Sequence, residues 1–160
     1  MAKISDLKLA YRIFMRAYPY RTLDWRPGAH LQKPLREARI AVVTTAGFFG
    51  PAQSPFDTSK RGGDCSYRAI TLDADLNSLG VAHRSDAFDI RGITEDKNLA
   101  LPLDRLKSLV QSRDIGFVAP RHFSFMGSIA SPGRLIANTG PEVAQALLDD
   151  GVDAVLLTPV

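Results

Sequence analysis

The eight residues Asp153-Ala154-Val155-Leu156-Leu157-Thr158-Pro159-Val160 decide how the fold is interpreted. The run from Ala154 to Leu157 is apolar without interruption, which is typical of a parallel strand that is buried on both faces. Residues 141–151, directly before it, have the pattern of a helix that ends near a glycine. Together the two segments predict the closing half of a βαβ unit, and therefore an α/β fold.

Working back from this unit, further strands and helices alternate along the chain. We expect strands over residues 39–45, 65–70, 79–83 and 115–119, and helices over residues 3–18, 103–113 and 141–150. This alternation predicts an open, mostly parallel sheet with flanking helices, layered as in Rossmann-like or flavodoxin-like proteins. The loop after Thr45 lacks the G-x-G-x-x-G pattern of a dinucleotide site, and we expect no cofactor.

The N-terminal part of the chain differs from the rest in charge. Residues 1–39 carry a net charge of +6, and the remaining residues carry −3. We predict a basic helix and arm over residues 1–38, and an α/β domain over residues 39–160. The basic arm suits a solvated helical face, an acidic partner or, less readily, nucleic acid, because no nucleic-acid motif accompanies the charge.

Length and composition exclude several classes of protein. A chain of 160 residues suffices for one domain with a sizeable core. No apolar run approaches the roughly 20 residues that span a bilayer, and the N-terminus lacks the pattern of a signal peptide, so we expect a cytoplasmic protein. The single cysteine, Cys65, excludes an internal disulfide and any multi-cysteine metal site.

Polar residues gather where the predicted strands end. Because the carboxyl ends of parallel strands meet at one edge of the sheet, we expect a small-molecule site there. Arginines suit the binding of a carboxylate or phosphate, histidines the transfer of protons, and threonines hydrogen bonding. Each residue also suits an ordinary structural role. The candidate substrate-binding residues are Thr44, Thr45, Arg68, His83, Arg121, His122 and Thr158.

The residue types allow two further kinds of site. Cys65 lies beside polar residues and suits either a nucleophile or a small buried side chain, and its expected direction opposite Ser66 favours the second role. His83, Asp86 and His122 are residues of types that bind metals, but their spacing matches no known metal motif, so we expect no metal.

Eight short motifs, taken in their order along the chain, resemble sequences of the selenoprotein B family. This is the family of the glycine, sarcosine and betaine reductase subunits and the related D-proline reductase subunit. The resemblance covers residues 38–160, and its specificity lies in the order of the set. The motifs are VVTTAGFF (42–49), SPFD (54–57), GDCSYRAI (63–70), AHRSD (82–86), Asp96-Lys97-Asn98, LPLDRLKSLV (101–110), IGFVAPRHFSFMG (115–127) and DGVDAVLLTPV (150–160).

The resemblance implies reductive cleavage of a C–N bond in a small amino acid or its derivative. It places the reactive selenocysteine or cysteine immediately after Thr158-Pro159-Val160, so we expect a chain truncated at that position and inactive as it stands. Selenocysteine is encoded by UGA, which is normally read as a stop codon, so the chain would end there if the codon were read as stop. The alternatives are a deliberate truncation and a natural remnant that has lost the redox residue.

Implied partners are other reductase subunits and a thiol or selenol electron donor, and an unfinished sheet would also favour self-association. The alternative is a non-catalytic α/β subunit that binds a small carboxylate or a partner protein.

Overall fold

The computed structural model describes residues 9–18, 24, 28–85 and 88–160. The chain divides into two units, residues 1–30 and 31–160, and each is described by itself. In the first unit, helix α1 (Leu9–Ala17) confirms the predicted helix over those residues, while residues 3–8 lie outside the described part. Among the described residues of this unit, Leu9, Ile13, Phe14 and Tyr18 have exposed large apolar side chains. Within the described residues, no helix is both long and apolar enough to cross a membrane.

Strand β1 (Arg39–Thr44) is the centre of the main sheet in the second unit. Strand β7 (Ala154–Thr158) pairs with one edge of β1 in parallel, from Ile40 opposite Ala154 to Thr44 opposite Thr158. Strands β5 (Phe117–Val118) and β6 (Arg121–Phe125) follow each other along the opposite edge, also in parallel. Strand β3 (Tyr67–Thr71) is antiparallel to β6 and completes the sheet. The predicted mostly parallel α/β sheet is therefore confirmed.

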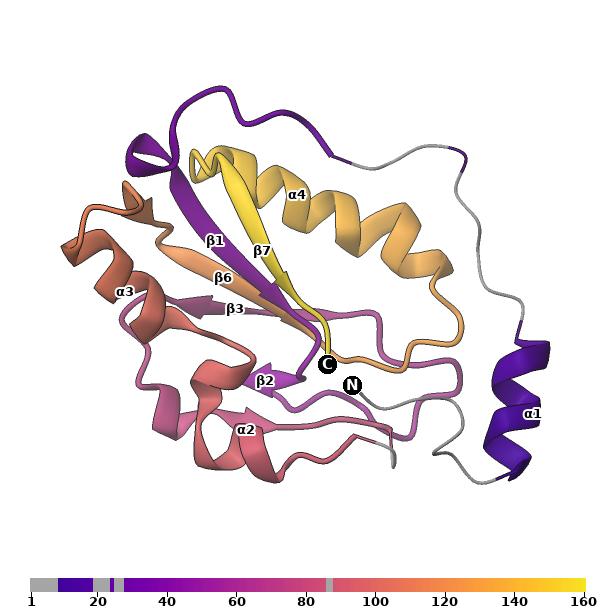
Figure 1. The fold of residues 1–160 in the computed structure, drawn as a ribbon. Helices are drawn as coiled ribbons and strands as arrows, with labels where there is room; N and C mark the ends of the chain where they lie inside the picture. The colour runs from indigo at the N-terminus through magenta and orange to yellow at the C-terminus, as the bar shows by residue number, and fades with distance from the viewer. Residues whose placement is uncertain (1–8, 19–23, 25–27, 86–87) are drawn as a thin grey trace. The chain divides into compact units, whose positions relative to one another are not determined.

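Helices cover both faces of this sheet, because alternate residues of β1 point to opposite sides. Figure 1 shows helix α4 (Gly140–Asp149) on one face and helices α2 (Arg91–Glu95) and α3 (Leu103–Gln111) on the other. Ala41 packs with Val143 and Leu147 of α4, whereas Ile40 and Val42 pack with the α3 side. The sheet and the helices on its two faces therefore form three layers, with one apolar cluster at each interface. The predicted helices at 103–113 and 141–150 are confirmed within two residues.

The remaining elements are short. Strand β2 (Phe48–Phe49) pairs antiparallel with β4 (Gly80–Val81). Of the strand expected over residues 79–83, these two residues of β4 form a strand. Single turns lie at Leu35–Glu37 (η2), Leu76–Ser78 (η3) and Lys97–Leu99 (η4), and a π-helical segment, η5 (Leu135–Thr139), leads into α4.

The placement of Arg121 and His122 after a strand was wrong, because both residues begin β6. The strand expected over residues 115–119 is interrupted after two residues. Ala119 still donates its N–H to the Ile40 carbonyl, but at the next position the Val42 N–H donates to Nδ1 of His122 instead of a backbone oxygen. The His122 side chain thus replaces one backbone hydrogen bond between the strands, and β1 then continues to pair with β6.

The expected burial of the terminal strand on both faces was also wrong. Val155, Leu156 and Leu157 are exposed, and Leu157 retains 67% of its accessible surface. The reason is that β7 is an edge strand. No described strand pairs with its other side.

Candidate functional site at the carboxyl edge of the sheet

Two glycines bring His83 to the carboxyl ends of β1 and β6. Gly47, just after β1, has a φ of +72°, and a Cβ there would lie 2.0 Å from the Ala82 carbonyl oxygen. The Ala82 N–H donates to the Gly47 carbonyl at 2.9 Å, which holds the two segments together. Gly127, just after β6, has a similar role, because a Cβ there would lie 2.4 Å from Nε2 of His83. Only glycine allows both approaches.

His83 presents a hydrogen-bond donor that is not used. Its Nδ1 accepts the Ser85 N–H at 3.1 Å, so the neutral ring carries its proton on Nε2. Nε2 is buried and has no hydrogen-bond partner among the described residues. Burial lowers the pKa of His83, which favours the neutral ring, and the ring packs 4.6 Å from that of Phe88. A small cleft of about 350 Å³ here is lined by His83, Ser85, Phe88, Ser128 and Val160.

Thr45 holds the end of the described chain at this edge. Its hydroxyl accepts the Val160 N–H at 2.9 Å and donates to a Val160 oxygen at 3.3 Å. The Thr45 N–H also donates to the Thr158 carbonyl. These reciprocal bonds fix Val160 beside both Thr45 and the His83 cleft. Val160 was not among the predicted site residues, and its contacts were not readable from the sequence.

An apolar groove of about 570 Å³ opens on the other side of Thr45, between the sheet and α4. Its walls come from β1, β7, α4 and the segment after β6, and its lining residues include Val43, Thr45, Met126, Val143, Leu157 and Val160. Because Val160 lines both this groove and the His83 cleft, it lies between an apolar and a more polar space. Pockets of this kind, mostly apolar with a few polar groups, are typical of small-molecule sites.

The strand register places Arg68, Ser124, Thr44 and Thr158 opposite one another across four strands. Thr44 and Ser124 are fully buried. The Thr44 hydroxyl accepts the Ala46 N–H, and that of Thr158 donates to the Ala100 carbonyl at 2.7 Å. Both predicted threonines therefore hold the strand ends in place. Ser124 was missed, although the alternation in His122-Phe123-Ser124-Phe125 was a strand signal.

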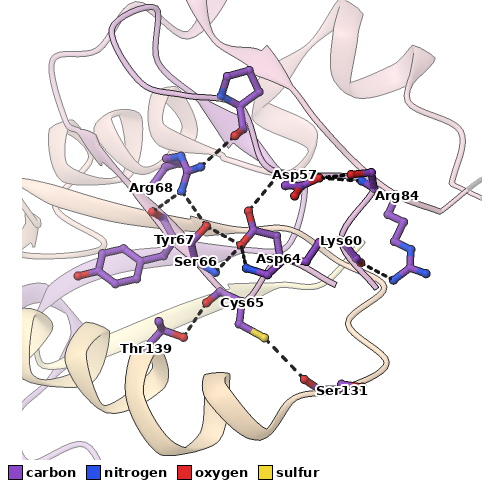
Figure 2. Close-up of polar contacts among 12 residues, drawn as sticks. Asp57, Lys60, Asp64, Cys65, Ser66, Tyr67, Arg68, Arg84, Ser131 and Thr139 are labelled. Atoms are coloured by element: carbon purple, nitrogen blue, oxygen red, sulfur yellow. Dashed lines mark hydrogen bonds and ion pairs between the residues drawn. The ribbon is translucent and has the colours of Figure 1, made fainter. Parts of the chain in front are cut away.

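The guanidinium of Arg68 is held by the loop before β3, as Figure 2 shows in part. It lies 4.3 Å from the centre of the Phe56 ring. Its donors contact the carbonyl oxygens of Ser54, Pro55 and Tyr67 and the hydroxyl of Ser66. These contacts make Arg68 an anchor for the loop that contains residues 54–56.

Asp64 and Cys65 organise the same loop (Figure 2). Asp64 accepts the N–H groups of Asp57 and Ser66, and these bonds outweigh the opposing effect of burial and lower its pKa. Cys65 is buried, its thiol points to the Ser131 carbonyl at 3.7 Å, and its own carbonyl accepts the Thr139 hydroxyl. Asp64 therefore joins two parts of this loop, and Cys65 has the burial expected of a packing residue.

Arg121 and His122 lie toward the opposite edge of the sheet from Thr45. Arg121 makes a two-pronged pair with Asp150, with both N···O distances at 2.8 Å, which raises the Arg121 pKa and lowers that of Asp150. His122 is fully buried, and its pKa is lowered to about 4, chiefly by burial and also by Lys107. Of the seven predicted residues, Thr45 and His83 face the open spaces at the carboxyl edge.

The metal-binding residue types considered above do not converge. Asp86 lies outside the described residues. Within residues 9–18, 24, 28–85 and 88–160, no three His, Cys, Asp or Glu side chains lie close enough together to hold a metal ion.

Comparison with known proteins gives a family and two relatives. The model of the family described as glycine/sarcosine/betaine reductase selenoprotein B matches residues 6–160. D-proline reductase subunit gamma of Acetoanaerobium sticklandii is 35% identical over 134 residues, covering 84% of this chain and 52% of that protein. Sarcosine reductase complex component B subunit beta of Peptoclostridium acidaminophilum is 27% identical over 157 residues, covering 94% of this chain and 34% of that protein. The chain thus spans about half of the first relative and a third of the second. No solved structure matches significantly.

Proposed function

Because the chain belongs to the glycine/sarcosine/betaine reductase selenoprotein B family, we propose that it forms part of a reductase subunit acting on a small amino acid or its derivative. The names of both relatives, a D-proline reductase subunit and a sarcosine reductase subunit, support this class of reaction. The proposed reaction is reductive cleavage of a C–N bond within a complex of several subunits.

The observation that carries this proposal is the position of Val160. The family resemblance places the reactive selenocysteine or cysteine directly after this residue. Thr45 holds Val160 between the apolar groove and the His83 cleft. A residue that follows Val160 would therefore begin at the edge of the sheet where ligands of α/β proteins bind.

The chemistry requires a reductant from outside the described residues. Reductive C–N cleavage takes two electrons and two protons, forms one C–H and one N–H bond, and leaves a dithiol or thiol–selenol donor oxidised. Cys65 is the only cysteine in the sequence and is buried, so it cannot form an intramolecular disulfide as the product of this step. We propose that the residue after Val160, together with a thiol or selenol protein, supplies the electrons.

Of the seven residues predicted to bind substrate, we propose that Thr45 and His83 do so. They face open space at the carboxyl edge, whereas Thr44, Arg68, Arg121, His122 and Thr158 are held by contacts within the fold. An amino-acid carboxylate would then accept a hydrogen bond from the Thr45 hydroxyl in place of the Val160 oxygen to which it now donates, beside the His83 ring.

The first test is to read the gene through the codon after Val160 and to measure the intact mass of the native protein. A UGA or cysteine codon followed by an open frame, with a mass well above 17.5 kDa, is the expected result. The native complex should then reduce D-proline, sarcosine, glycine or betaine with a dithiol donor. An ordinary stop, a native mass of 17.5 kDa and no turnover would refute the reductase proposal.

The second candidate function is a non-catalytic subunit that binds a small carboxylate or a partner protein. The apolar groove and the exposed side chains of β7 favour it, because they form a binding surface without a redox group. This function predicts ligand or partner binding to the 160-residue chain with no reductase activity in any reconstituted complex.

A further inference from the structure

We infer that a second site, separate from the carboxyl edge of the sheet, binds a small oxyanion, that is, a phosphate or carboxylate group. The site is a cleft of about 370 Å³, and its lining residues include Lys60, Arg61, Gly63, Ser131, Gly133 and Arg134. None of these residues lines the apolar groove or the His83 cleft. The inference therefore goes beyond the proposed function and does not depend on it.

Two consecutive glycines bring the walls of this cleft together. Gly62 and Gly63 have φ values of +87° and +100°, in the region that favours glycine. A Cβ on Gly62 would lie 2.8 Å from the Ser131 side chain, and a Cβ on Gly63 would lie 2.9 Å from Cα of Ile129. The Ser131 N–H donates to the Gly62 carbonyl at 2.9 Å, and the Cys65 thiol points to the Ser131 carbonyl (Figure 2). The fold therefore holds two cationic segments, residues 60–61 and residue 134, on opposite walls of one cleft.

The positive charge of this cleft is only partly neutralised. Among the described residues, the guanidinium groups of Arg61 and Arg134 have no ion-pair or hydrogen-bond partner. Lys60 lies 3.6 Å from Asp64, but that carboxylate already accepts two backbone N–H groups. Asp64 and Glu142 line the neighbouring cleft and not this one. Like charges repel one another, so an oxyanion bound between these three cations would relieve an unfavourable interaction.

The donors at this cleft suit an anion with several oxygens. Arginine binds carboxylate and phosphate oxygens through pairs of N–H groups, and lysine adds a point charge. Residues 133–134 are helical, lead directly into η5 and line the cleft, so the partial positive charge of a helix start adds to that of the side chains. Arg84 supplies a further cation beside this wall, because its guanidinium donates to the Lys60 carbonyl at 3.3 Å (Figure 2). Paired N–H donors favour an oxyanion over a spherical ion such as chloride.

The experiment titrates the whole chain with inorganic phosphate, and separately with acetate, while sodium chloride keeps the ionic strength constant. The backbone amide NMR signals of Gly63, Ser131 and Gly133 report binding. We expect these signals to shift and to saturate with phosphate. Arg61→Gln and Arg134→Gln should each weaken binding about two- to fivefold, the range for one exposed ion pair, and the double variant should abolish saturation. Saturation with acetate as well would extend the site to carboxylates, and saturation with phosphate alone would assign it to phosphate groups.

Two further variants are the controls. Arg105→Gln, a change to an exposed arginine of α3 that does not line the cleft, should leave the affinity unchanged. Arg134→Lys keeps the charge but loses the paired donors, so its affinity should lie between those of the parent and Arg134→Gln. Because the guanidinium groups of Arg61 and Arg134 have no partner among the described residues, we expect their removal to leave the urea unfolding midpoint unchanged or slightly raised.

Shifts that rise in proportion to the phosphate concentration without saturating would overturn the inference. Equal affinities of the parent and the double variant would overturn it too, because the cations of the cleft would then have no part in binding. The titration measures no reductase activity and needs no partner subunit. Failure of the proposed function would therefore leave its result as it is.

Discussion

At the scale of single residues, His122 shows how one side chain can replace a backbone hydrogen bond. Its Nδ1 accepts the Val42 N–H at 3.0 Å in the middle of the sheet, and the ring is fully buried. A protonated ring could not accept this bond and would carry a charge into an apolar layer. The residue type was visible in the sequence as a candidate for proton transfer, but its pairing with β1 depended on the register.

We predict that His122 makes the fold less stable in acid. Its pKa is about 4 in the folded chain against about 6.5 for an ordinary histidine. Its contribution is therefore complete above pH 6.5 and is lost as the pH falls toward 4, by up to about 3 kcal/mol in the free energy of unfolding. Urea unfolding at pH 7 and pH 5 measures this change.

The control for this prediction is His122→Gln, which keeps an acceptor for the Val42 N–H but does not titrate. The variant should be less stable at pH 7 and should lose less stability than the parent between pH 7 and 5. An identical pH dependence in parent and variant would show that other groups cause the effect.

Arg121 gives a second prediction at this scale. Because its guanidinium pairs with Asp150 at the end of α4, Arg121→Gln should lower the unfolding midpoint. In the reductase complex proposed above, the same variant should bind substrate as tightly as the parent. Asp150→Asn is the matched control for the midpoint, and a weaker substrate affinity in Arg121→Gln alone would restore Arg121 to the carboxylate-binding role.

At the scale of elements, β7 is an edge strand with an unusual surface. Natural edge strands are commonly protected by charge, by proline or by a covering segment. Residues 154–158 carry no charge, and Val155, Leu156 and Leu157 are exposed. The edge and the groove beside α4 form one continuous apolar surface, since Val155 and Leu157 belong to both.

We predict that this surface causes the 160-residue chain to self-associate. Leu157→Lys should lower the sedimentation coefficient at high protein concentration toward that of a monomer, with an unchanged circular dichroism spectrum. Leu148→Lys is the control, because Leu148 is equally exposed on α4 but does not line the groove. Equal effects of the two variants would mean that general hydrophobicity, and not the β7 edge, drives association.

At the scale of the whole molecule, all residues described in the two apolar clusters belong to the second unit. One cluster packs on the α3 side of the sheet and the other on the α4 side. Their residues lie within 38–154. The first unit, residues 1–30, holds much of the basic charge. Burial of apolar surface is the main favourable term in folding, so the second unit contains most of what stabilises it.

We therefore predict that deletion of residues 1–30 leaves the thermal unfolding midpoint of the remaining chain unchanged. The deletion should also remove any salt-sensitive binding of an acidic partner, because most of the excess positive charge goes with it. Differential scanning calorimetry of the two chains checks the first point. A clear fall in the midpoint would show that the first unit stabilises the second.

The sequence by itself determined the α/β class, the strand at residues 39–44, the helices at 103–111 and 140–149, and the family. Hydrophobic periodicity and motif order are local properties, so they can be read along the chain. Tertiary structure alone decided which strand lies at the edge, how His122 replaces a ladder bond, and that Arg68 and Arg121 are held by their neighbours. It also brought Thr45, His83 and Val160 together, because sheet register and the close approaches at Gly47 and Gly127 join segments far apart in the sequence.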